Sequence, residues 1–168
     1  GLAAVFIRMA KCNLACKFCD TEFEVGTKRP VDELVNQVRH LVPAPDARQL
    51  GEVGSPSRQA WAVRELNPWI ILTGGEPGLQ NCGPLILTLQ AAGFKVAIET
   101  SGSVYAEWMS HLDHICVSPK VPLARVPTPL KLMASEFKWI VNAAFLGQYE
   151  KDPEQMYVPG CFNYLQPE

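Results

Sequence analysis

Short apolar, β-branched runs recur along the chain and alternate with stretches of helical spacing. The runs predict six strands, at residues 4–9, 69–73, 94–98, 114–117, 137–141 and 162–165. Helical spacing covers residues 31–42, 84–92 and 143–151, with Pro84 suited to a first turn and Gly93 to a C-terminal cap. Strands that alternate with helices favour right-handed crossovers and a parallel sheet. Six strands are too few for a closed eight-stranded barrel, so we predict an α/β fold: a partial, open (β/α)6-type barrel with mostly parallel strands.

Two stretches break the alternation and are predicted to be loops. Residues 43–67 are rich in Pro, Gly, Ser and Arg, and residues 121–129 hold three prolines. The first is long enough to be a functional loop or an insertion. A chain of 168 residues with 48% apolar content can build one ordinary core, so we expect a single domain over residues 1–168.

Charge and hydropathy exclude two classes of partner. The net charge is −2 with no block of like charges, which argues against a nucleic-acid surface. No apolar run approaches the roughly 20 residues of a membrane span, and the N-terminus lacks the pattern of a signal peptide. We therefore predict a cytoplasmic protein without a membrane or nucleic-acid partner.

The six cysteines are distributed unevenly, which indicates metal ligation rather than a disulfide framework. Cys12, Cys16 and Cys19 directly follow the first predicted strand, whereas the other three stand alone. Three thiolates can hold a 4Fe-4S cubane and leave its fourth iron open for another ligand. A structural zinc site is the alternative, but it needs a fourth ligand, and no histidine or lone cysteine lies at an obvious ligand spacing.

Polar residues also follow the next strands, at the edge of a parallel sheet where ligands bind. Thr73-Gly74-Gly75-Glu76-Pro77 combines two glycines, which permit close backbone approach, with a carboxylate that can accept hydrogen bonds from an ammonium group. Glu99-Thr100-Ser101-Gly102 and Ser118-Pro119-Lys120 follow the third and fourth strands. Each segment alone is ordinary turn chemistry, but their recurrence at successive strand ends favours a binding site.

The spacing CxxxCxxC, with an aromatic residue just before the last cysteine, resembles the signature of radical S-adenosylmethionine enzymes. The resemblance implies a barrel of that class, a 4Fe-4S cluster on Cys12, Cys16 and Cys19, and S-adenosylmethionine chelated by the open iron and cleaved to a 5'-deoxyadenosyl radical. The Gly-Gly-Glu-Pro segment is similar to the methionine-binding segment of the class. In such enzymes the cofactor carries the difficult chemistry while the protein positions and shields it.

A narrower resemblance spans nearly the whole chain. Arg8, Cys12-Asn13-Leu14, Phe18-Cys19-Asp20-Thr21, the Gly-Gly-Glu-Pro segment, the two later strand-end segments and Leu165-Gln166-Pro167 together resemble the 7-carboxy-7-deazaguanine synthase family. Membership implies a carbon–nitrogen lyase of queuosine biosynthesis, which converts 6-carboxy-5,6,7,8-tetrahydropterin by radical ring contraction with loss of ammonia. It also implies Mg²⁺ as a further cofactor, a flavodoxin-like reductant and a homodimer.

The resemblance implies roles for individual residues. Arg8 would bind the pterin carboxylate, Thr73 would contact substrate, and Thr21 would give its hydroxyl to Mg²⁺. Contacts to S-adenosylmethionine would come from Phe18, Cys19, Asp20, Gly75, Glu76, Ser101, Ser118, Pro119, Lys120 and Gln166. Lys11 departs from the pattern, since the family often has glycine there. The chain is also expected to lack part of the family's N-terminal and C-terminal ends.

Two other functions remain open from the sequence. A small activase that makes a glycyl radical on a partner protein shares the cysteine loop, although Cys19-Asp20-Thr21 and Ser118-Pro119-Lys120 favour the pterin interpretation. A zinc-binding interaction module belongs to another class and would use the cysteines only for folding. An iron–sulfur chromophore would exclude the zinc module.

Overall fold

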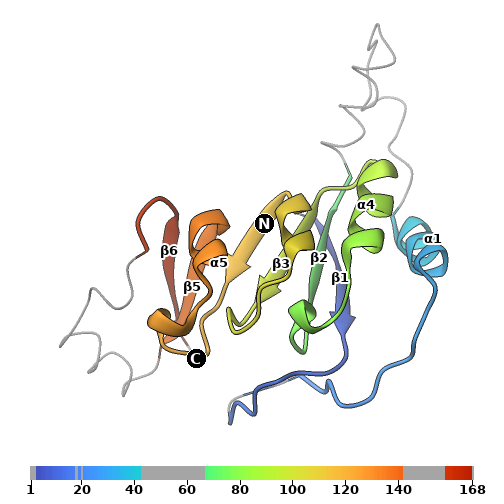
Figure 1. The fold of residues 1–168 in the computed structure, drawn as a ribbon. Coiled ribbons are helices and arrows are strands. Elements are labelled where there is room, and N and C mark those ends of the chain that lie inside the picture. The colour runs from blue at the N-terminus through green and yellow to red at the C-terminus, as the bar shows by residue number, and fades with distance from the viewer. Residues whose placement is uncertain (1–2, 18, 20, 43–66, 142–157, 168) are drawn as a thin grey trace, which may run out of the picture.

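A computed structural model describes residues 3–17, 19, 21–42, 67–141 and 158–167 of the chain. Helices and short 3-10 turns separate the first five of its strands (Figure 1). The strands are β1 (Ala4–Met9), β2 (Trp69–Gly74), β3 (Val96–Thr100), β4 (His114–Val117), β5 (Glu136–Val141) and β6 (Phe162–Pro167).

The strands form one sheet in the order β1-β2-β3-β4-β5-β6, and all five neighbouring pairs are parallel. The register places Arg8 beside Thr73, and Glu99 beside Cys116. Because every strand runs the same way, all six carboxyl ends lie at one edge of the sheet. The predicted α/β architecture with parallel strands is therefore confirmed.

The helices are placed by apolar stripes and by prolines that fit a first helical turn. The α-helices are α1 (Val31–Leu41), α4 (Gly83–Ala91) and α5 (Thr128–Met133), and the 3-10 helices are η1 (Pro77–Leu79), η2 (Glu107–His111) and η3 (Leu123–Arg125). Figure 1 shows α1 and α4 side by side next to the β1–β3 part of the sheet, and these two helices are in contact. No helix within the described ranges is long and apolar enough to cross a membrane.

The core lies between the sheet and these helices. Alternate strand residues such as Leu72 and Ile98 turn toward the helices and are fully buried. Val35 and Val38 of α1 and three residues of α4 (Leu85, Ile86 and Leu89) complete this layer. The other face of the sheet therefore carries the intervening residues, including Thr73, Glu99 and Lys138.

Some predicted elements differ from the observed ones, and others are not tested. β3 begins at Val96 rather than at residue 94. The predicted loop at residues 121–129 contains η3 and the start of α5, because Pro129 fits the first turn of a helix, where no backbone N–H is needed. The predicted helix at residues 143–151 and nearly all of the predicted loop at residues 43–67 lie outside the described residues.

Candidate functional site

The cysteine loop begins directly after β1 and is anchored to the turn that follows β2. The Gly75 N–H donates to the Met9 carbonyl at 2.8 Å, and the Glu76 N–H donates to the Lys11 carbonyl at 2.9 Å. The Gln80 side chain donates to the Ala10 carbonyl at 2.8 Å. Three consecutive carbonyls at the start of the loop are therefore held by one turn.

This close approach explains both glycines of the turn. A Cβ atom at Gly75 would lie 1.9 Å from the Lys11 carbonyl oxygen, and one at Gly74 would lie 2.5 Å from the Met9 nitrogen. Gly74 also has a φ of +107°, a conformation that side chains rarely adopt. The glycines thus allow the cysteine loop to pack against the β2 turn.

Lys11, just before the first cysteine, has a φ of +71°. Its N–H donates to the Phe23 carbonyl at 2.6 Å, which closes the two ends of the cysteine loop onto each other. A lysine in the left-handed region is strained, and the strain lies one residue before Cys12.

Glu76 is the most buried polar group of the site, with an exposed fraction of 0%. Its Oε1 accepts from the Thr100 hydroxyl at 2.8 Å and from the Gly78 N–H at 3.0 Å. Its Oε2 accepts from the Ser101 N–H at 2.9 Å and from the Ser101 hydroxyl at 2.5 Å. The carboxylate therefore joins the β2 turn to the end of β3.

The polar contacts continue from Glu76 to the cysteine loop. The Ser101 and Ser103 hydroxyls are 2.8 Å apart, and the Ser103 hydroxyl donates to the Asn13 side-chain oxygen at 3.2 Å. Asn13 lies beside Cys12. Ser103 did not stand out in the sequence, and Asn13 was noted only as part of the cysteine motif, because nothing in the spacing relates two residues so far apart.

The turn after β4 packs against the end of β3. The Ser118 N–H donates to the Thr100 carbonyl at 2.8 Å, and the Lys120 N–H donates to the Ser101 carbonyl at 3.1 Å. The Lys120 ammonium donates to the Ser118 hydroxyl at 2.8 Å. The four segments picked out by the sequence at the ends of β1 to β4 thus meet at one edge of the sheet.

Lys120 and the cysteines influence each other electrostatically. Burial raises the pKa of the Cys16 thiol, the thiolates of Cys12 and Cys19 raise it further, and the Lys120 charge lowers it. Burial lowers the pKa of Lys120, against the opposing effect of Cys16. The charge of Lys120, on the turn after β4, therefore acts on the cysteine loop.

A row of polar side chains lies on the face of the sheet that points away from α1 and α4. We call this face the open face. Thr73 donates to Glu99 at 3.4 Å, and the Lys138 ammonium donates to the other oxygen of Glu99 at 3.0 Å. Burial alone would lower the pKa of Lys138, but the hydrogen bond to Glu99 and the negative charges of Cys116, Glu99 and Glu136 together outweigh it, and the pKa is raised. The sequence drew attention to Glu99 only as part of a turn and gave no sign of Lys138, which lies on a distant strand.

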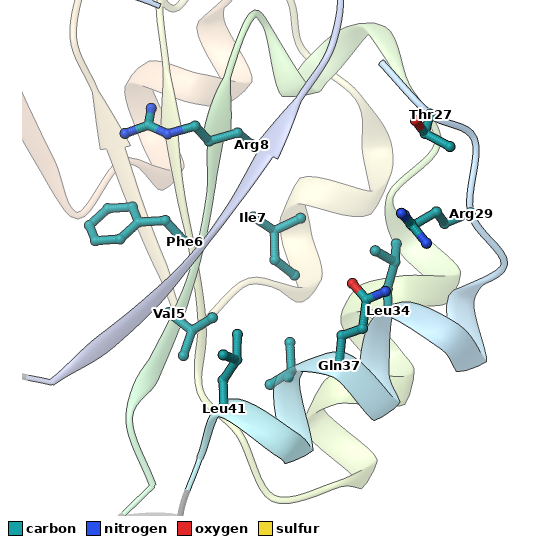
Figure 2. Close-up of a pocket in the computed structure, with 10 residues that line it drawn as sticks. Val5, Phe6, Ile7, Arg8, Thr27, Arg29, Leu34, Gln37 and Leu41 are labelled. Carbon is teal, nitrogen blue, oxygen red and sulfur yellow. The ribbon is translucent and has the colours of Figure 1, made fainter.

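Arg8 joins this face at its edge. Figure 2 shows Phe6 and Arg8 directed to one side of β1, while Val5 and Ile7 point toward α1. The Arg8 side chain is exposed and lies beside Thr73 in register. Its guanidinium is thus available to an anionic ligand on the open face.

Fewer contacts are described for the other predicted site residues. Phe18 and Asp20 lie outside the described residues. Cys19 contacts the Thr21 carbonyl, with the sulfur 3.7 Å from the oxygen, and Pro119 is half-buried between Ser118 and Lys120. Gln166 is exposed on β6. This strand lies at one side of the sheet, and β1, which leads into the cysteine loop, lies at the other side.

Three thiolates on one loop are the donor set that a 4Fe-4S cubane uses. Within the described ranges, no group of three His, Cys, Asp or Glu side chains is arranged to hold one metal ion. A cubane binds each thiolate through a different iron, so its ligands do not converge on one point. Cys12, Cys16 and Cys19 are neighbours on one loop and supply the soft donors that iron–sulfur clusters use.

The fold and the site together define an α/β protein with an open, six-stranded parallel sheet and a three-cysteine loop at the end of its first strand. An open sheet of parallel strands, with the cysteine loop after the first of them, is what the sequence predicted. A solved structure described as QueE from Escherichia coli is similar, with a TM-score of 0.66 and 22% identity over 100% of this chain and 76% of that one. The predicted fold class is therefore confirmed.

The curated relatives identify the particular resemblance. Proteins named 7-carboxy-7-deazaguanine synthase are 36% identical over 121 residues in Rickettsia prowazekii, 37% over 146 in Burkholderia multivorans and 36% over 155 in Rhodospirillum rubrum. These matches cover 72%, 76% and 91% of this chain, and 44%, 59% and 54% of the relatives. No family model matches the chain. The chain is thus related to the 7-carboxy-7-deazaguanine synthases and spans about half the length of the curated relatives it matches.

Proposed function

We propose that the chain carries the catalytic core of a 7-carboxy-7-deazaguanine synthase, a radical S-adenosylmethionine lyase. The observation that carries the proposal is the meeting of the cysteine loop with the turns after β2, β3 and β4, in a chain whose curated relatives bear that name. The substrate would be 6-carboxy-5,6,7,8-tetrahydropterin. The product and ammonia together contain all the atoms of the substrate, so the net reaction consumes no oxidant.

Cys12, Cys16 and Cys19 would hold the 4Fe-4S cluster. When bound, the cluster and S-adenosylmethionine supply the radical chemistry that starts and ends the rearrangement. Gly75 would let the backbone approach the methionine group, and the turn at residues 118–120 would offer hydroxyl and ammonium donors to S-adenosylmethionine. Phe18, Asp20, Ser101 and Gln166 are further candidates for this contact, from the resemblance alone.

Substrate would occupy the open face of the sheet. Arg8 can grip a carboxylate with two parallel N–H bonds, because its guanidinium is exposed there. Thr73 lies beside Arg8 in register and has a hydroxyl that can bond to a ring nitrogen or oxygen. Thr21, half-buried two residues after Cys19, would give an oxygen ligand to Mg²⁺, which prefers hard oxygen donors.

The direct test is an anaerobic assay. The protein is reconstituted with iron and sulfide, reduced, and supplied with S-adenosylmethionine, Mg²⁺ and 6-carboxytetrahydropterin, with mass spectrometry of the products. The proposal predicts 7-carboxy-7-deazaguanine and ammonia. Formation of 5'-deoxyadenosine without that product would overturn the substrate assignment, and a protein that takes up no cluster would overturn the class.

Cysteine variants assign the cluster ligands. Cys12→Ala, Cys16→Ala and Cys19→Ala should each abolish the visible iron–sulfur absorbance and the product. Cys161→Ala is the matched control, because Cys161 contacts the Val158 carbonyl near β6, outside the loop. Full absorbance in any of the three loop variants would contradict the assignment. The reductant, taken as flavodoxin-like, and a homodimer are further expectations, tested by electron delivery to the cluster and by light scattering.

A further inference from the structure

The Glu76 carboxylate has all its acceptor positions occupied by protein donors, which its position in the Gly-Gly-Glu-Pro segment does not reveal. A carboxylate oxygen accepts about two hydrogen bonds in the plane of its group, and Oε1 and Oε2 each accept two from protein donors. The side chain is fully buried. A ligand in the site could reach these oxygens only by displacing the Thr100, Gly78 or Ser101 donors.

The bonds of Glu76 connect three strand ends. Its N–H bonds the Lys11 carbonyl after β1, and its carboxylate bonds the Thr100 hydroxyl and the Ser101 N–H at the end of β3. A second route returns to the cysteine loop. The Ser101 hydroxyl donates to Glu76 and accepts from the Ser103 N–H at 3.3 Å, and the Ser103 hydroxyl donates to the Asn13 side-chain oxygen. The cysteine loop is thus tied to Glu76 at Lys11 and again at Asn13, on both sides of Cys12.

We propose that Glu76 is a positioning residue that fixes the cysteine loop through Ser101, Ser103 and Asn13, rather than a direct contact to a bound ligand. This inference rests on the proposed function for its use of the loop. The placement of the loop by Glu76 holds in the cluster-free chain as well. A buried carboxylate with four donors is a rigid anchor, because losing any one donor leaves a buried acceptor unsatisfied.

The decisive experiment is amide hydrogen exchange in the 168-residue, cluster-free chain, followed in peptides that cover residues 9–24. Glu76→Gln replaces one acceptor oxygen with an NH₂ group that faces the existing donors. Exchange in the cysteine loop should become about tenfold faster, as expected for losing a hydrogen bond to a charged group. Glu33→Gln, a change of an exposed glutamate on α1, is the matched control and should leave the loop unchanged.

Milder variants guard against a simple folding defect. Thr100→Val removes one donor from the carboxylate, and Thr100→Ser keeps it and should restore slow exchange. Ser103→Ala cuts the route to Asn13 at a half-buried residue, so it should speed loop exchange about threefold without moving the thermal unfolding midpoint. A purely structural role for the network would shift that midpoint instead. Unchanged loop exchange in Glu76→Gln, Thr100→Val and Ser103→Ala would overturn the proposal.

The reconstituted protein gives a second measurement. Glu76→Gln and Ser103→Ala should each speed the loss of visible absorbance to a chelator in the absence of S-adenosylmethionine, and the double variant should be no faster than Glu76→Gln alone. A direct ligand role predicts the opposite result: normal cluster retention and weakened S-adenosylmethionine binding in Glu76→Gln only. If the wild type forms no product, the proposed function fails, while the exchange result still decides the role of Glu76.

Discussion

The two halves of the sheet are held together in different ways. At the carboxyl ends of β1, β2 and β3, side-chain and backbone bonds tie separate turns together, with the buried Glu76 at their centre. At β6, by contrast, Phe162, Tyr164 and Leu165 are exposed, and the strand is held by its parallel pairing with β5. A buried polar network whose members are all satisfied fixes one arrangement of its turns, whereas strand pairing alone does not fix the side chains of β6.

The largest contrast should come from adding one methyl group to a glycine in each half. Gly75→Ala would press a Cβ against the Lys11 carbonyl and should destabilise the cluster-free protein by about 3 kcal/mol. Gly160→Ala has open space around it but a φ of +85°, so it should cost only about 1 kcal/mol. Denaturant unfolding of both variants checks this, and equal costs would contradict the close packing of the cysteine loop.

The next largest effect should be a pH dependence of the free energy of unfolding, caused by buried thiols. Burial raises the pKa of Cys82 from 9.0 to about 11, so the folded chain favours the neutral thiol. Its contribution to stability is complete below pH 9 and declines as the pH rises toward 11, by about 2 kcal/mol in total. The free energy of unfolding of the cluster-free chain, measured in reductant, should therefore fall over this window.

Cys82→Ala is the control for that decline. The variant should lose stability less steeply between pH 9 and 11 than the wild type does. A residual slope is expected, because burial also raises the pKa of Cys116. Identical slopes in the two proteins would show that Cys82 does not contribute.

Removing the backbone strain at Lys11, before the first cysteine, should change the free energy of unfolding by a smaller amount and should raise it. Lys11→Gly removes the side chain at a φ of +71° and should stabilise the cluster-free protein by about 1 kcal/mol. Lys17→Gly, in the same loop but without a positive φ, should be neutral or destabilising. Thermal unfolding compares the two, and a destabilised Lys11→Gly variant would contradict the strain.

The smallest effect should come from the exposed β6 surface. Phe162 is 70% exposed, so Phe162→Ser should change the free energy of unfolding by about 0.5 kcal/mol. The reconstituted variant should retain its cluster like the wild type, unlike Ser103→Ala. Rapid loss of visible absorbance from Phe162→Ser would show that the two halves are coupled.

The sequence located the six strands because each is a short apolar run between turn residues. It missed α5, since three prolines in residues 121–129 indicate a loop, yet Pro129 is compatible with a first helical turn. It also identified the turns that form the site, because parallel strands bring their carboxyl ends together. It could not predict that Glu76 faces Thr100 and Ser101, or that Glu99 pairs with Lys138, because such partners depend on register between distant strands.

Strand order that equals chain order has a consequence for the folding pathway. Residues 10–68 separate β1 from β2, whereas only residues 75–95 separate β2 from β3. Loop-closure entropy grows with the length of the intervening chain, so pairing β1 with β2 is the costliest closure in the sheet. We therefore expect β1 to join a sheet already formed by its neighbours and to bring the cysteine loop into place as a late event of folding.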